Sequence, residues 1–146
     1  MSAVTYIDAC KVIHEYLTMQ NPPSGTSLLY PLVGARVEID VNPREFQNAQ
    51  ASVVLAEVGG DKRHSSPISA PRMEFRCYGG GDNPELARQV SLALSAQLHR
   101  ANNVVCTSGV LMSAMKQGGG GLVWTPPGVW PYIVEWFRIL VKPKET

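Results

Sequence analysis

Residues 71–98 read PRMEFRCYGGGDNPELARQVSLALSAQL, and this stretch decides the fold class. Its first part alternates, with Met73, Phe75 and Cys77 at every second position. A period of two predicts a strand with these three side chains directed inward and the residues between them directed outward. The outward positions are Arg72, Glu74, Arg76 and Tyr78.

A helix is expected directly after the three glycines. Asp82 or Asn83 can cap its first turn, and Pro84 suits the first helical position. Apolar residues then recur every three or four positions as far as about residue 101, which is the period of a helix packed on one side. The inward stripe consists of Leu86, Val90, Ala93, Leu94 and Leu98. A strand that leads through a short turn into such a helix indicates a helix packed against a sheet.

The segments on either side complete this pattern. Residues 4–19 predict an amphipathic helix that ends at Asn21-Pro22-Pro23, followed by an irregular connection over residues 22–34. Strands are expected over 36–41, 51–58, 104–107, 110–116 and 132–142. The chain therefore predicts an α+β fold in which two helices pack against a mainly antiparallel or mixed sheet, in a single domain spanning residues 1–146.

Composition narrows the class of protein. The 146 residues are 45% apolar and only 17% charged, with a net charge of +1. The high apolar and low charged content favours a globular chain. The small net charge gives no basic field that would attract nucleic acid. The sequence also has no apolar run long enough for a membrane span. The first residues lack the order of a signal peptide. Three cysteines without a CxxC pair are interpreted as buried thiols in a reducing compartment.

Two glycine runs raise the question of a phosphate site. Residues 118–121 are followed by neither the lysine nor the hydroxyl residue of a P-loop, and the next segment is strand-like. Residues 79–81 do precede a helix, but Asp82 and Glu85 place negative charge where a phosphate would bind. We interpret both runs as turns, and residues 118–121 as a flexible bend between two strands.

Catalytic and metal-binding patterns are also missing. His14, His64 and His99 have no second ligand at metal-binding spacing. Ser65 and Ser66 have no adjacent base and orienting group. The sequence predicts no catalytic residue, cofactor or metal, although an enzyme whose site is scattered along the chain stays an alternative.

Interaction surfaces are the remaining candidates. Leu92 lies opposite Val90 on the second helix, among polar residues, and is either an ordinary exposed leucine or a contact. Tryptophans at positions 124 and 130 flank a Pro-Pro-Gly turn and either fold back onto the core or meet a partner. The interface candidates are Arg44, Lys62, Arg63, His64, Leu92, Trp124 and Trp130.

The layout resembles the tail terminator, or tail completion, proteins of long-tailed bacteriophages. The resemblance rests on Phe75-Arg76-Cys77-Tyr78 leading through glycines and acidic residues into the helix at Pro84. It rests equally on the sequence GVWPYIVEWFRILV, in which a Gly-x-Trp-Pro turn precedes the final strand. It covers most of the chain as a pattern, and neither piece is a catalytic signature.

The resemblance implies a structural neck protein of the virion, assembled in the host cytoplasm. Such a protein forms a ring, typically a hexamer, that caps the tail tube, ends tail polymerisation and joins the tail to head completion or connector proteins. DNA passes through the lumen without specific binding. The polar loop over residues 59–71 is expected to be mobile in the monomer and to order against a neighbour. A related head-closure or tail-tube-like subunit is the alternative.

Overall fold

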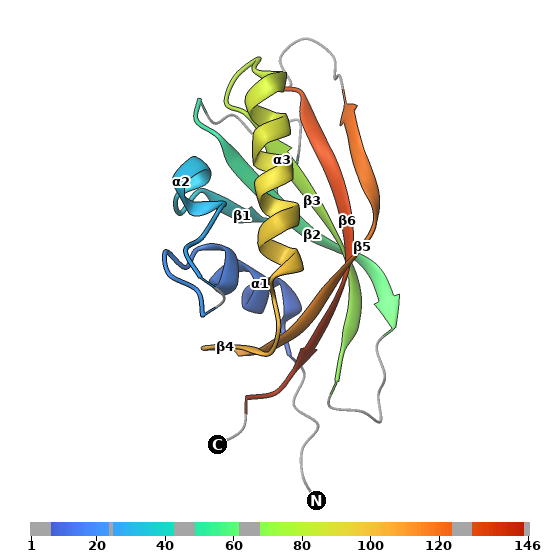
Figure 1. Cartoon of the computed structure of the whole chain (residues 1–146). Helices are drawn as coiled ribbons and strands as arrows, with labels where there is room; N and C mark the ends of the chain where they lie inside the picture. The colour runs from blue at the N-terminus through green and yellow to red at the C-terminus, as the bar shows by residue number, and fades with distance from the viewer. Residues whose placement is uncertain (1–6, 24, 43–48, 62–67, 124–129, 145–146) are drawn as a thin grey trace, which may run out of the picture.

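A single curled sheet forms the centre of the computed structural model, with three helices packed on one of its faces (Figure 1). The structure describes residues 7–23, 25–42, 49–61, 68–123 and 130–144. The six strands lie in the order β1-β2-β3-β6-β5-β4. The elements are α1 (Ala9–Leu17), α2 (Tyr30–Val33), β1 (Val37–Ile39), β2 (Ser52–Asp61), β3 (Ala70–Tyr78), α3 (Pro84–His99), β4 (Val104–Cys106), β5 (Gly109–Val123) and β6 (Tyr132–Lys142).

The pairing of the strands confirms the predicted α+β class. Strand β1 runs parallel to β2, and all the other named pairs are antiparallel. The sheet is therefore mixed, and α2 is a short third helix within the connection that was expected to be irregular. The final strand β6 lies between β3 and β5, which agrees with its apolar character on both faces.

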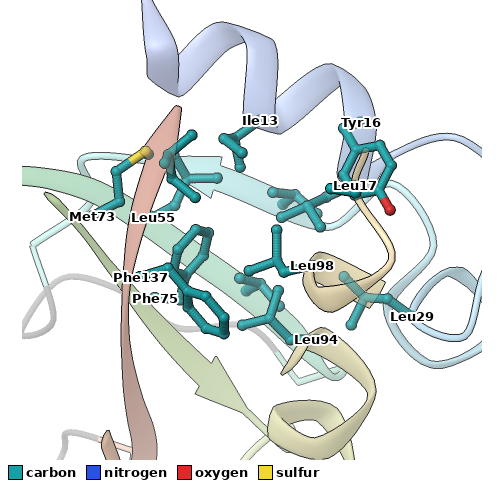
Figure 2. Packing of buried hydrophobic residues seen from close by; sticks show 14 of the residues in the cluster. Ile13, Tyr16, Leu17, Leu29, Leu55, Met73, Phe75, Leu94, Leu98 and Phe137 are labelled. Atoms are coloured by element: carbon teal, nitrogen blue, oxygen red, sulfur yellow. The ribbon is translucent and has the colours of Figure 1, made fainter. Parts of the chain in front are cut away.

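The main core lies between the helices and the sheet. Figure 2 shows Leu94 and Leu98 of α3 facing the phenylalanines of the sheet. Phe75 of β3 and Phe137 of β6 meet edge to face, with ring centroids 5.7 Å apart, a geometry that aromatic pairs favour. The predicted inward residues of β3 are all fully buried. Their alternation is thus confirmed.

The turn between β3 and α3 explains the first glycine run. Asn83 is the residue that caps α3, and its side chain accepts a hydrogen bond from the backbone N–H of Leu86 at 3.1 Å. A Cβ atom on Gly79 would lie 2.1 Å from the carbonyl oxygen of Asn83 and 2.6 Å from the nitrogen of Ala87. The helix therefore begins so close to the strand end that only glycine fits there.

Two elements near the N-terminus are shorter than the sequence predicts. Asp8 lies within the helix expected over residues 4–19, but it precedes α1 and caps it by accepting a hydrogen bond from the backbone N–H of Lys11. The strand expected as far as residue 41 ends at Ile39, because Asp40 adopts a left-handed backbone with φ of 56°. Aspartate tolerates this conformation better than most residues. The turn breaks the alternation, so Ile39 is 37% exposed and Val41 packs elsewhere.

Strand β2 is longer than predicted. It was expected to end before Gly59, but it continues through both glycines to Asp61. A register shift between Glu57 and Gly59 marks a bulge, and Gly59 has φ of 138°. Glycine accommodates such a bulge, so here it bends the strand without ending it. Residues 62–67 of the predicted polar loop lie outside the described residues.

The tetraglycine segment is part of a strand, and its interpretation as a bend between strands is wrong. Strand β5 runs through residues 118–121 and stays paired with β6 up to Val123. Register shifts before Gly118 and before Gly121 show that the ladder is bulged on both sides of Gly119. A Cβ on Gly119 would lie 2.4 Å from the carbonyl oxygen of Val134 and 2.7 Å from a carboxylate oxygen of Glu135. The glycines thus allow β5 to lie directly against a buried acidic side chain.

Candidate functional site

The buried acid in β6 is the centre of a polar cluster under α3. Glu135 is only 2% exposed and lies on the core side of the sheet, between Ile133 and Phe137 in the alternation. The hydroxyl of Ser91 in α3 donates a hydrogen bond of 2.6 Å to its Oε1. The ammonium of Lys116 in β5 lies 3.1 Å from its Oε2, as an ion pair without hydrogen-bond alignment.

This cluster has the properties of a structural device. Ser91 is 4% exposed and Glu135 is 2% exposed, so a substrate cannot reach either group. The side chain of Lys116 is half exposed and extends into the core past the glycines that follow it. A buried carboxylate requires hydrogen bonds and a counter-charge. The cluster supplies both and connects α3 to β5 and β6.

A histidine and three thiols are further polar groups in or beside the core. His14 of α1 is half-buried, and its Nε2 donates to the carbonyl of Val37 at 2.9 Å. Burial raises the pKa of Cys10 and of Cys106 to about 11, with nearby carboxylates adding to the effect. All three cysteines are free and buried, so their thiols are protonated near neutral pH. Among the described residues, no three His, Cys, Asp or Glu side chains gather to hold a metal ion.

The sheet face opposite the helices is covered at one end. Val54 and Tyr78 are fully buried there and pack with Val41, Trp130 and Tyr132. The predicted outward position of Tyr78 is thus on the expected face, but it is not exposed. The guanidinium of Arg76, only 6% exposed, donates to the carbonyl of Val41 and lies 5.8 Å from the ring centroid of Tyr132.

Farther along that face lie five exposed or partly exposed side chains that we call the outer patch. Met115 of β5 is 67% exposed, and its cross-strand neighbour on β6 is Arg138. Arg72 is exposed and lies over the ring of Trp136 at 5.6 Å. The outer patch consists of Arg72, Glu74, Met115, Trp136 and Arg138. It combines a methionine, an indole and guanidinium groups, residue types that are enriched in protein interfaces.

A second exposed surface lies on the opposite side of the molecule. Leu92 of α3 is 67% exposed, because it points away from the stripe that packs on the sheet. Three of its helical neighbours at spacings of three and four, Arg88, Gln89 and Ala96, are also exposed. We call this surface the α3 stripe; it consists of Glu85, Arg88, Gln89, Leu92, Ala96 and His99. Leu92 is the only large apolar side chain in it.

The sequence-based interface candidates have mixed outcomes. Leu92 is exposed, as its position on the helix indicates. Trp130 is partly buried and packs on the small cluster around Tyr78, which favours the folded-back alternative for this residue. Arg44, Lys62, Arg63, His64 and Trp124 lie outside the described residues. The outer patch was missed, although the alternation of β3 had placed Arg72 and Glu74 outward.

Comparison with known proteins adds no assignment. The sequence matches no protein-family profile, and no curated protein aligns with it significantly. Within the described part of the chain, none of the helices has the length and apolar character needed to cross a membrane.

Proposed function

We propose that this protein is a structural ring subunit at the end of a bacteriophage tail. The ring caps the tail tube, ends its polymerisation and joins the tail to the head completion or connector proteins. The observation that carries the proposal is the presence of two different exposed apolar sites on opposite faces of one small domain. Leu92 and Met115 are each 67% exposed, and the sheet with its core separates them.

Two unlike surfaces on opposite sides suit a head-to-tail assembly. When one surface of a copy binds a different surface of the next copy, the contact repeats until the rotation closes a ring. A two-fold dimer would instead use a single surface that contacts itself. A sixfold ring is the order that the resemblance to tail terminators implies.

The charges are consistent with a channel through which DNA passes. The net charge of the chain is +1. A chain with so small a net charge does not provide the dense positive field that retains a phosphate backbone. The ring is expected to be a component of the virion neck, with the tail tube protein and the connector proteins as its partners.

A closely related role is the second candidate. A head-closure or tail-tube-like subunit is also a structural role and would use the same two surfaces. An enzyme is less favoured, because the carboxylate of the polar cluster under α3, Glu135, is only 2% exposed. Purified tail tubes and portal-bearing heads distinguish the structural roles: a terminator binds the tubes, whereas a head-closure protein binds the heads.

Leu92→Asp tests the ring directly. The substitution places a charge at the centre of the α3 stripe, so it should abolish assembly while the monomer stays folded. Val105→Asp is the matched control, because it places the same charge on an apolar residue of β4 that is 57% exposed and lies outside both surfaces. Sedimentation velocity and negative-stain imaging report assembly, and circular dichroism reports folding. Rings that form equally well with Leu92→Asp would contradict a role for this residue.

A further inference from the structure

The outer patch has the side-chain chemistry to receive a helix of a neighbouring copy. We infer that the α3 stripe of one subunit docks on the outer patch of the next. This inference rests on the proposed ring and names the two surfaces that close it. Helices packing on a sheet face is already the arrangement of the core on the other side of this sheet.

The apolar parts of the two surfaces complement each other. Leu92 is the one large apolar side chain of the α3 stripe. A partner surface that buries it needs only a small group of apolar side chains. Trp136 and Met115 provide such a group on neighbouring strands β6 and β5. Trp136 is held in place by the guanidinium of Arg72. An aromatic side chain fixed in this way offers contact area at a low cost in conformational entropy.

The charges follow in a matching order. Arg88 precedes Leu92 by one helical turn, which is about 6 Å along the axis. On the patch, Glu74 lies directly across from Trp136 on the adjacent strand, about 4.8 Å away. A helix that crosses the strands with Leu92 on Trp136 and its N-terminal end toward β3 brings the guanidinium of Arg88 within reach of the carboxylate of Glu74. The pair adds orientation to an apolar contact.

The edge of the sheet is a poorer docking surface. Strand β4 pairs with β5 only over residues 109–111, and the rest of β5 has β6 as its partner among the described strands. Three register shifts interrupt β5 along this length. Bulges are a feature by which proteins prevent edge pairing. The faces, and not this edge, are therefore the surfaces through which copies associate.

Cysteine cross-linking tests the contact, because the native thiols do not compete. Cys10, Cys77 and Cys106 are all buried, and burial raises the pKa of each. Leu92→Cys and Met115→Cys chains are mixed and treated with a short bifunctional thiol reagent. The proposal predicts a cross-linked dimer at least tenfold more abundant in the mixture than with either variant alone. Val105→Cys, at a residue 57% exposed on β4, replaces Met115→Cys as the control and should give none.

Three outcomes separate this contact from the ring itself. Selective linkage of 92 to 115 supports the docking. If oligomers form without this linkage, the docking contact is refuted, but the proposed ring is not. A chain that stays monomeric at all concentrations, including in the presence of tail tubes, overturns both.

Charge exchange provides a second measurement of the same contact. Arg88→Glu and Glu74→Arg should each reduce the 92–115 linkage at least tenfold, and the two together in one chain should restore it. Linkage that the double exchange fails to restore, in variants that melt like the parent protein, would overturn the pairing of these two residues.

Discussion

Replacing Gly119 with alanine should destabilise the fold strongly. Gly119 has φ of 117°, and a non-glycine residue in a left-handed conformation costs about 1–2 kcal/mol. The added Cβ would also lie 2.4 Å from the carbonyl oxygen of Val134 and 2.6 Å from the Cα of Glu135. These are backbone atoms of a central strand, so relief requires movement of β6, and overpacking of this kind costs about 1–3 kcal/mol.

The two terms give an expected loss of about 2–5 kcal/mol in the free energy of unfolding. For a domain of this size the melting temperature falls by roughly 3 °C per kcal/mol, hence on the order of 6–15 °C. Gly121→Ala is the matched control, because nothing lies within 4 Å of a Cβ at Gly121. It should be neutral or stabilise by up to about 1 kcal/mol through the unfolded state.

Chemical denaturation and thermal melting followed by circular dichroism measure both variants. Equal stability of Gly119→Ala and Gly121→Ala would refute the reasoning. It would mean that the glycine segment is a flexible connection, as the sequence pattern suggests, and that β5 does not press on Glu135.

Two further predictions concern the core. Lys116→Met removes the cation beside the buried carboxylate of Glu135. It should cost about 1–3 kcal/mol, less than the loss of a fully buried pair, because the lysine side chain is half exposed and screened by solvent. Lys11→Met, at an exposed position of α1, should change little, and equal losses in denaturant titrations would contradict the ion pair. Stability should also fall as pH rises from 9 to 11, because the pKa values of Cys10 and Cys106 are raised from 9.0 to about 11 in the folded state. Below pH 9 the thiols are protonated in both the folded and the unfolded state, whereas between pH 9 and 11 only the unfolded state releases these protons. An unfolding free energy that stays constant over this range would count against the burial of the thiols. The same conclusion would follow if the unfolding free energy fell equally after both thiols were replaced by alanine.

The strength of local patterns determines how much of the fold the sequence predicts. The alternation around Phe75 and the capped start of α3 are local signals, and both are confirmed. The tetraglycine was misinterpreted, because glycine indicates a turn unless a strand partner is known. The reason for the glycines is Glu135, which lies in another strand, so no local window contains both.

The candidate surfaces show the same limit. Leu92 could be placed outward from helical periodicity alone. Met115 and Trp136 become neighbours only through the register of β5 and β6, which depends on three bulges. Bulges shift every later residue of a strand to a different partner. A patch that spans three strands was therefore beyond what sequence spacing could show.

The central claim is that this chain closes into a ring through two unlike faces. The most direct measurement is the mass and shape of the assembly formed at high concentration or on purified tail tubes, by mass photometry and negative-stain imaging. We predict a closed ring with a mass about six times that of the 15.9 kDa chain. We also predict that Leu92→Asp abolishes this ring. A monomer under every condition, or a two-fold dimer that Leu92→Asp leaves intact, would contradict it.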